Sequence, residues 1–531
     1  MSLGRSTFAV LLRGVALGTA LTAITAPLSA WAAIEPPLRA ADGMSNDNFG
    51  IDVAVDGDIA VVGAPDKDDG RGAVYVFVRQ PGGWTQTGKL LASDITPLDN
   101  LGRSVAIDGD TIVAGAPNAD VPGAPANAGV VYTFSTTGPP TRYETAKLIA
   151  SDYGSNSAYL GGSVAIDGDT IVAGAVTGRS YIGAAYTFAA SGAALRTETS
   201  ELTASDAAVD DGFGATVAID GPTIAVGAPK NGPGAVYLFA RTGPPTRHEL
   251  PALVASDGRA GDRLGGSLAL RGESLLVGAG GADVAGVESS GAVYDFERSA
   301  TSGWRQVGKL AALNPVYNER LGASVAVEDG IVVAGAPGPG SPDFGEVGAA
   351  YTFTAEGPAT RSELERLQAP APAVYDLFGW SVAGAGDELL IGVPNDRANG
   401  NLDQGAVMRF RTPPVPPDVD PPALTLRVDR RQRLGRPLLA HAICDEDCEL
   451  IAGGRVWLAG RRNLRLREAR VGLMPDQPAS IRLELSRRLR RVIAKSGDGR
   501  GRARVRVAAA DTAGNLTVRR AKVVLRSRAG A

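Results

Sequence analysis

The feature that most constrains the fold is a sequence unit that occurs seven times, at intervals of 51 to 59 residues. Each copy contains four apolar segments of four to seven residues separated by Gly, Asp or Pro, which is typical of short β-strands. Four strands per unit at this interval predict the blades of a β-propeller. We therefore expect an all-β, seven-bladed propeller whose copies open at Gly50, Gly102, Gly161, Gly214, Gly265, Gly322 and Gly379.

An Asp-Gly pair lies between the first two apolar segments of four copies, beginning at Asp56, Asp108, Asp167 and Asp220. This pair is favoured in two-residue hairpin turns, because glycine readily adopts the positive φ that such turns require. We expect the first two strands of each blade to be adjacent and antiparallel.

The seventh copy ends after its third strand, at Phe410, so its blade lacks a fourth strand. A segment from Leu38 to Asp42 precedes the first copy, and Asp42 stands seven residues before Phe49, as Asp94 stands seven residues before Leu101. This spacing predicts that the N-terminal segment supplies the missing strand and closes the ring, which removes two open sheet edges.

Residues 1–32 have the parts of a secretory signal peptide: a basic start, an apolar core and a small-residue cleavage site. We expect residues 33–411 to form the propeller, 412–423 a proline-rich linker, and 424–531 a second domain. The second domain alternates polar and apolar residues with a period of two, which predicts a β-sandwich. It carries 26 Lys and Arg against 10 Asp and Glu, whereas residues 1–423 carry 27 against 47.

The opening Phe49-Gly50 and four Gly-Ala-Pro triplets identify a family. The triplets are Gly63-Ala64-Pro65, Gly115-Ala116-Pro117, Gly227-Ala228-Pro229 and Gly335-Ala336-Pro337. With seven copies they resemble bacterial FG-GAP repeat proteins, whose relatives include the propellers of integrin α-subunits. The second domain resembles bacterial immunoglobulin-like modules. The integrin resemblance would imply calcium loops between the first two strands, but the Asp-Gly turn here is too short for 6 to 8 oxygen ligands.

Side-chain chemistry narrows the function. The chain has only two histidines and two cysteines, which disfavours catalytic triads, zinc sites and haem ligation. We expect no metal and no cofactor. Cys444 and Cys448 are predicted to form a local disulfide, because disulfides persist outside the cell.

Aspartates are the candidate ligand residues. The connections after the second and fourth strands should share one face, and variable loops on a rigid scaffold are common binding sites. The predicted ligand residues are Asp66, Asp68, Asp69, Asp94, Asp152, Asp206 and Asp257. Because the aspartates gather on it, we expect this face to be acidic and to favour basic or cationic ligands. The alternative is that the aspartates at the ends of fourth strands cap their own turns. The segment from Asp66 to Gly70 is the best isolated cation candidate.

A further position recurs six residues before the fourth-strand leucine, and it is occupied by Trp84, Arg142, Arg196, Arg247, Trp304 and Arg361. Both residue types have a flat body with a polar rim, so we expect them to cover the outer edges of blades.

Together these patterns predict a secreted or cell-surface protein without enzymatic activity, which binds an extracellular protein or a cell-surface polymer through its propeller loops. A glycan-binding propeller is an alternative, and a carboxylate-based hydrolase or lyase is a weaker one. We expect no nucleic-acid partner and no transmembrane segment once the signal peptide is removed.

Overall fold

The computed structural model divides the chain into two compact units, residues 1–413 and 414–531. The predicted signal segment 1–32 and linker 412–423 lie outside the described residues. The described ranges are 33–152, 158–177, 181–244, 246–247, 252–299, 303–328, 330–338, 347–355, 360–397, 400–411, 424–429, 431–433, 438–444, 448–458, 461–465, 469–473, 479–483, 500–510 and 516–526.

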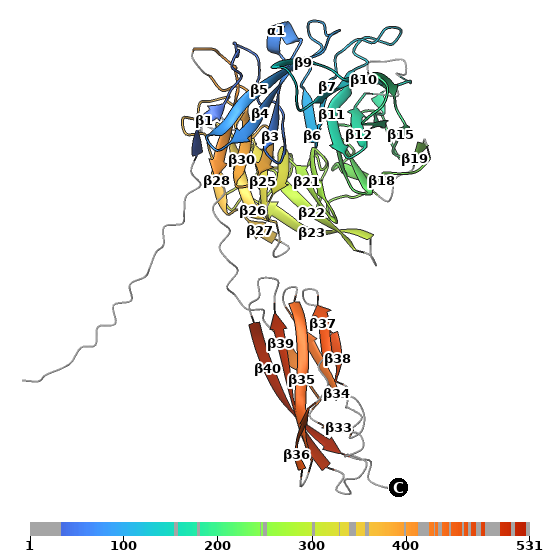
Figure 1. Cartoon of the computed structure of the whole chain (residues 1–531), viewed down its shortest axis with the longest axis vertical. Helices are drawn as coiled ribbons and strands as arrows, with labels where there is room; N and C mark the ends of the chain where they lie inside the picture. Colours follow the sequence, from blue (N-terminus) through green and yellow to red (C-terminus); the bar gives the residue numbers. More distant parts are fainter. Residues whose placement is uncertain are drawn as a thin grey trace, which may run out of the picture. The chain divides into compact units, whose positions relative to one another are not determined.

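The first unit consists of seven small sheets, numbered 1 to 7 in chain order (Figure 1). Sheet 1 contains β2 (Val53–Asp56), β3 (Ile59–Ala64), β4 (Ala73–Gln80), β5 (Gly83–Leu91) and β9 (Thr141–Tyr143). Sheet 2 contains β6 (Ser104–Asp108), β7 (Thr111–Ala116), β8 (Val130–Ser135), β10 (Ala146–Ile149) and β14 (Leu195–Thr197). Sheet 3 contains β11 (Leu160–Asp167), β12 (Thr170–Ala175), β13 (Ala184–Ala189), β15 (Ser200–Leu202) and β19 (Thr246–Arg247).

The other four sheets follow the same order. Sheet 4 contains β16 (Thr216–Asp220), β17 (Thr223–Ala228) and β18 (Ala235–Ala240). Sheet 5 contains β20 (Ser267–Arg271), β21 (Ser274–Ala279), β22 (Ala292–Ser299), β23 (Gly303–Ala311) and β27 (Thr360–Ser362). Sheet 6 contains β24 (Ser324–Glu328), β25 (Ile331–Ala336), β26 (Ala349–Thr354) and β28 (Glu365–Leu367). Sheet 7 contains β29 (Val382–Ala385), β30 (Glu388–Val393), β31 (Ala406–Arg411) and β1 (Ala33–Leu38).

The first two strands of the sheets form the predicted antiparallel hairpins. In sheet 1 Asp56 pairs with Ile59, so the turn itself is Gly57 and Asp58 rather than Asp56 and Gly57. Gly57 has φ of 54°, which glycine tolerates at the first position of such a turn. The Asp56 carboxylate instead accepts the backbone N–H of Gly109, 2.7 Å away in the next sheet.

The seven sheets close into a ring, an arrangement consistent with propeller blades. The first strands of successive sheets contact one another in the order β2, β6, β11, β16, β20, β24, β29 and back to β2. A single parallel bridge also joins each sheet to the opening residue of the next copy, as between Gly72 and Leu101, and the last one joins Gly405 to Phe49.

Glycine in the Gly-Ala-Pro triplets allows neighbouring sheets to approach closely. A Cβ atom at Gly115 would lie 1.9 Å from the carbonyl oxygen of Gly161, the opening glycine of the next copy. The last interface has the same geometry, because a Cβ at Gly392 would lie 2.2 Å from the carbonyl oxygen of Gly50. The triplet glycine of one copy and the opening glycine of the next copy therefore contact each other directly, and this contact joins the two sheets.

The predicted ring closure is confirmed. Strand β1 pairs antiparallel with β31, with Leu38 opposite Val407 and Ala33 opposite Phe410. The pairing strand begins earlier than the sequence suggested, at Ala33. Arg39, the residue after β1, also joins the N-terminal segment to the seventh copy through its ion pair with Asp396.

The prediction of four strands per blade is incomplete. Sheets 1, 2, 3 and 5 gain a fifth, parallel strand from the next copy; in sheet 1 Leu90 of β5 pairs with Arg142 of β9. Arg142 is buried and donates to the carbonyl oxygens of Ser135 and Thr136 at 2.9 and 2.6 Å. This arginine therefore holds the connection between two sheets rather than covering an outer edge.

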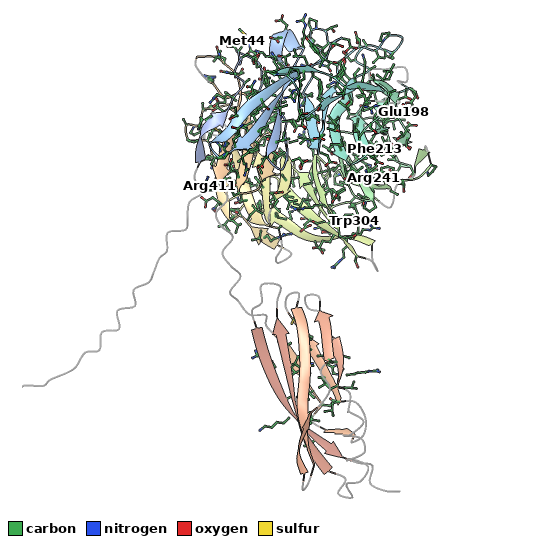
Figure 2. All side chains as sticks on the ribbon, viewed as in Figure 1. Met44, Glu198, Phe213, Arg241, Trp304 and Arg411 are labelled. Carbon is green, nitrogen blue, oxygen red and sulfur yellow. The ribbon has the colours of Figure 1, made fainter. Side chains whose placement is uncertain are left out.

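Aromatic residues of the same copy pack against one another beside the interfaces between sheets. Phe213, which opens the fourth copy and is labelled in Figure 2, packs edge-on against Tyr237, and their ring centroids lie 5.4 Å apart. Trp84 is half-buried, and its indole N–H donates to Glu388 of sheet 7 at 3.0 Å.

The second unit contains two sheets around one hydrophobic core. The first sheet contains β32 (Thr425–Arg427), β34 (Leu438–Ile443) and β38 (Ala479–Leu483). The second contains β33 (Arg431–Arg433), β40 (Leu516–Arg526), β39 (Arg500–Ala510), β35 (Cys448–Leu458), β36 (Arg461–Arg465) and β37 (Ala469–Leu473). The core includes Leu438 and Ile481 from one sheet and Val505 and Val523 from the other. Within the described ranges, no helix of either unit has the length and apolar character needed to cross a membrane.

Candidate functional site

The connections after the second and fourth strands lie together on one face of the ring, as predicted. The backbone N–H of Asn100, just before the second copy, donates to the carbonyl of Gly70 in the loop after β3 at 2.8 Å. The N–H of Leu98 donates to the carbonyl of Asp69 at 3.2 Å. We call this surface the loop face.

The aspartates at the ends of fourth strands are engaged by the next sheet. The Asp94 carboxylate accepts the Tyr132 hydroxyl at 2.8 Å and the Lys147 ammonium, both from sheet 2. The backbone N–H of Ser93 donates to Glu144 of the same sheet at 2.9 Å. We call the trio of Asp94, Tyr132 and Lys147 a clamp, because it fastens the end of one sheet to the next.

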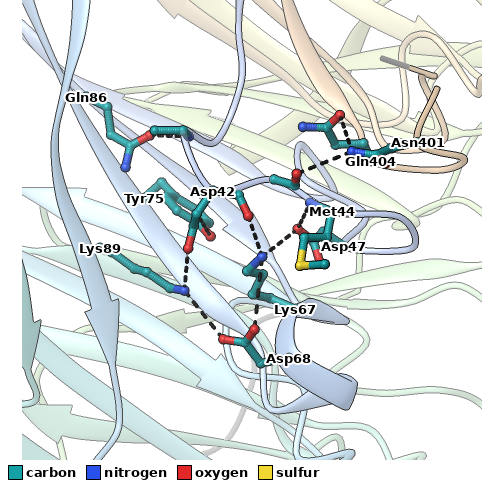
Figure 3. Close-up of polar contacts among 12 residues, drawn as sticks. Asp42, Met44, Asp47, Lys67, Asp68, Tyr75, Gln86, Lys89, Asn401 and Gln404 are labelled. Carbon is teal, nitrogen blue, oxygen red and sulfur yellow. Dashed lines mark hydrogen bonds and ion pairs between the residues drawn. The ribbon is translucent and has the colours of Figure 1, made fainter. Parts of the chain in front are cut away.

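Equivalent clamps recur around the ring. Asp42 is held by Tyr75 and Lys89, each at 2.7 Å, and Asp257 by Tyr294 at 2.8 Å and Lys309 at 2.7 Å (Figure 3 shows the first). Asp206 accepts the Tyr237 hydroxyl at 2.7 Å. Beside Tyr186, burial and then the charge of Asp152 raise the pKa of the phenol. Asp94, Asp152, Asp206 and Asp257 therefore lie at separate interfaces between sheets, each beside a tyrosine of the next sheet. That they contact a ligand on the loop face stays a prediction.

The clamps should make stability depend on pH. Burial alone would raise the pKa of the Asp94 carboxyl, but hydrogen bonds from Lys147 and Tyr132 hold it below the usual value. A lowered pKa stabilises the fold above the unfolded value of about 3.9 and loses this contribution as pH falls through the folded pKa. We expect urea unfolding at pH 7 and pH 3 to show a smaller acid loss in Lys147→Met than in the parent chain. Equal losses would contradict the clamp.

The cation candidate from Asp66 to Gly70 is occupied by the protein's own ammonium group. Residues Lys67–Gly70 form the single turn α1. Lys67 is 2% exposed, and its Nζ lies 2.6 Å from the Asp42 carbonyl oxygen and 3.0 Å from the Asp47 carboxylate (Figure 3). Asp68 lies 4.0 Å from Lys67 and 3.4 Å from Lys89. The loop therefore directs a lysine inward instead of gathering its carboxylates.

No group of three or more metal-ligating side chains is found among the residues that the structure describes. Asp69, the last predicted ligand residue of this loop, is exposed.

Cys444 is buried and disulfide-bonded. The side chain of its expected partner, Cys448, lies outside the described residues.

A pocket of about 270 Å³ opens on the loop face where sheets 1 and 2 meet. Its residues come from the segment that precedes β2, from the loop after β3, from the segment that precedes β6 and from the loop after β7. They are Ile51, Pro65, Asp66, Asn100, Arg103, Pro117 and Asn118. Of the predicted ligand residues, the pocket contains only Asp66.

Amide side chains fix one wall of this pocket. The two Asp66 carboxylate oxygens accept from Asn48 at 2.6 Å and from Asn100 at 2.8 Å. Asn118 donates to the Asn100 side-chain oxygen at 2.6 Å. Arg103 is exposed, and no hydrogen bond or ion pair of its guanidinium is found in the described part of the chain. The pocket thus combines a fixed carboxylate–amide wall with a cation that is available to a ligand.

A second carboxylate lies near this pocket but is used by the backbone. Asp52 accepts the N–H of Val105 at 2.7 Å and the N–H of Val53 at 3.0 Å. Burial raises the pKa of its carboxyl, against these bonds and the charge of Arg103.

Sequence reasoning missed Asn100, Arg103 and Asn118. Two of them stand next to repeat motifs: Asn100 precedes Leu101-Gly102, and Asn118 follows Pro117. The residue before the opening pair is asparagine only in copies 1 and 2, where it is Asn48 and Asn100, and the residue after the triplet is Asp66 in copy 1 and Asn118 in copy 2. This difference from the other copies is the signal that could have indicated the pocket.

Comparison with known proteins supports the repeat assignment. The FG-GAP repeat family matches six segments, residues 35–77, 84–134, 143–188, 197–239, 249–296 and 362–408. The copy that opens at Gly322 is not matched, yet it forms sheet 6. No curated protein sequence matches the chain.

Similar solved structures include the Bombyx mori GH32 beta-fructofuranosidase, with 10% identity and a TM-score of 0.28 over 93% of this chain and 88% of that one. A Salmonella alpha-2-macroglobulin mutant has 12% identity and a TM-score of 0.16, over 86% of this chain and 30% of that one.

Proposed function

The chain belongs to the FG-GAP repeat family, and we propose that it is a non-enzymatic binding protein, secreted or held at the cell surface. In this proposal seven blades form an integrin α-like propeller, and an immunoglobulin-like module follows it. The loop face recognises an extracellular protein or a cell-surface polymer, as in adhesion.

The pocket between sheets 1 and 2 is the observation that carries this proposal. Loops supply its residues, while the hairpins behind them belong to a closed ring, so the site is held rigidly. Arg103 offers a cation to a ligand, and Ile51, Pro65 and Pro117 offer apolar contact. Because Asp66 is already bonded to Asn48 and Asn100, this mixture suits a short peptide segment with an acidic side chain, in contrast to the basic ligands that the acidic face as a whole would favour.

The distribution of carboxylates supports binding rather than catalysis. A carboxylate-based hydrolase needs two carboxyl groups that converge on one substrate. The clamp aspartates lie at separate interfaces, and Asp52 and Asp66 are held by backbone and asparagine N–H donors.

The test uses the full chain with a displayed random-peptide library and, in parallel, a glycan array. We expect acidic peptides to be selected, and Arg103→Ala to weaken their binding about tenfold, because a hydrogen bond to a charged group contributes about 1.5–3 kcal/mol. Arg259→Ala, an exposed arginine between sheets 4 and 5, is the control and should leave binding unchanged. Selected peptides insensitive to Arg103→Ala, or binding of glycans alone, would overturn the proposal.

A further inference from the structure

Four basic residues occupy one row across the larger sheet of the second unit. Arg465 of β36 is opposite Arg455 of β35, Arg455 is opposite Arg504 of β39, and Arg504 is opposite Lys522 of β40. Directly paired residues lie on the same face of a sheet. We call Arg465, Arg455, Arg504 and Lys522 the basic row.

Further basic residues occupy the nearby rows. The adjoining row on one side contains Arg506 and Arg520, and the adjoining row on the other side contains Arg502 between Trp457 and Val524. Beyond that row Arg500 pairs with Arg526. Among the six described strands of this sheet, the only acidic residue is Glu449, six positions from Arg455 along β35. At about 3.4 Å per residue this is roughly 20 Å away, so no acid within the sheet neutralises the basic row.

This basic face lies opposite the hydrophobic core. Alternate residues of β39, including Ala503, Val505 and Val507, are buried, which places the arginines between them on the other face. At the edge of the row Lys522 is exposed, and its neighbour Val524 is 42% exposed although Val523 between them is 1% exposed. The described residues of this face in β40 are therefore uncovered.

Such a row is unfavourable in the free protein. Like charges that stand directly opposite each other destabilise a sheet, and neighbouring strands are only about 4.8 Å apart. Three such contacts follow one another in the basic row. A polymer with regularly spaced anionic groups would turn each repulsion into attraction and would release its counterions on binding.

We propose that this face binds an acidic polysaccharide whose carboxylates lie along the basic row. The inference rests on the proposed secreted location, which brings the face to cell-surface polymers rather than to nucleic acid. Trp457 is paired with Arg502 in the adjoining row, and an aromatic residue at this register position is compatible with a sugar polymer.

The test measures binding of the full chain to polygalacturonate, with neutral dextran, double-stranded DNA and vesicles of anionic phospholipid as parallel probes. We expect polygalacturonate to bind and dextran not to bind. Arg504→Gln with Lys522→Gln should weaken polygalacturonate binding at least tenfold at low salt and reduce its salt dependence by about 1–2 in log–log slope.

The matched control is Arg427→Gln with Arg482→Gln, two exposed arginines on the smaller sheet of the same unit. This pair removes the same charge and should change binding less than twofold. Equal losses in both double variants, or tighter binding of DNA or vesicles than of polygalacturonate, would overturn the proposal. Arg103→Ala should leave polygalacturonate binding unchanged, so failure here is separate from failure of the loop-face site.

Discussion

Deletion of residues 33–41 is expected to prevent the propeller from folding as a monomer. The deletion removes β1, exposes the edge of β31, and breaks the ion pair of Arg39 with Asp396. Leu38 is 4% exposed, and burying such a side chain contributes about 1.5–3 kcal/mol by itself. Single domains are stable by only about 5–15 kcal/mol. We expect the deleted chain to lose its cooperative thermal transition for residues 33–411 and to aggregate in size-exclusion chromatography.

Two controls accompany this deletion. Pro36→Ala changes an exposed residue of the same strand and should leave the transition in place. A synthetic peptide of residues 33–42, added during refolding, should restore part of the monomer, because it can pair with β31. A deleted chain that stays monomeric and melts at the parental temperature would show that β1 is dispensable.

Lys67→Met should lower the free energy of unfolding by about 3–5 kcal/mol, as expected when one partner of a buried ion pair is removed. The substitution leaves the Asp47 carboxylate, 3% exposed, with the backbone N–H of Met44 as its donor at 2.7 Å. Urea unfolding at pH 7 measures the change.

The comparison for this variant is Arg298→Met. Arg298 and Glu273 form a surface pair at 3.9 Å, and such exposed pairs contribute about 0–1 kcal/mol. A loss of similar size in both variants would mean that the buried position of Lys67 is not what makes its ion pair important.

The ring could be predicted because each copy of the repeat predicts one blade and the seven copies can be counted in the sequence. Copy number, the hairpins and the missing fourth strand after Phe410 are all local patterns, and the spacing of Asp42 from Phe49 identified the closing segment. The fifth strands could not be read in the same way. The segment around Arg142 is three residues long and polar, so it has no strand signal of its own.

The role of the clamp aspartates was missed because their partners lie in another copy. Asp94 is 38 residues from Tyr132 and 53 residues from Lys147. An aspartate that follows a strand is normally taken to be exposed to solvent, so no local pattern indicated either contact. The segment from Asp66 to Gly70 was interpreted wrongly for a related reason. A lysine between aspartates is typical of an exposed charged loop, yet the Lys67 side chain is buried in the fold. Only the placement of neighbouring sheets decides which charges meet.

The central claim is that the N-terminal strand completes sheet 7, and an engineered disulfide tests it most directly. Leu38 is opposite Val407, and such antiparallel partners have Cα atoms about 4.5–5.5 Å apart, within the range that a disulfide spans. We predict that the Leu38→Cys/Val407→Cys variant, mildly oxidised and digested, yields one linked peptide pair containing positions 38 and 407 from monomeric protein. Free thiols at both positions, or links only between molecules, would contradict the account.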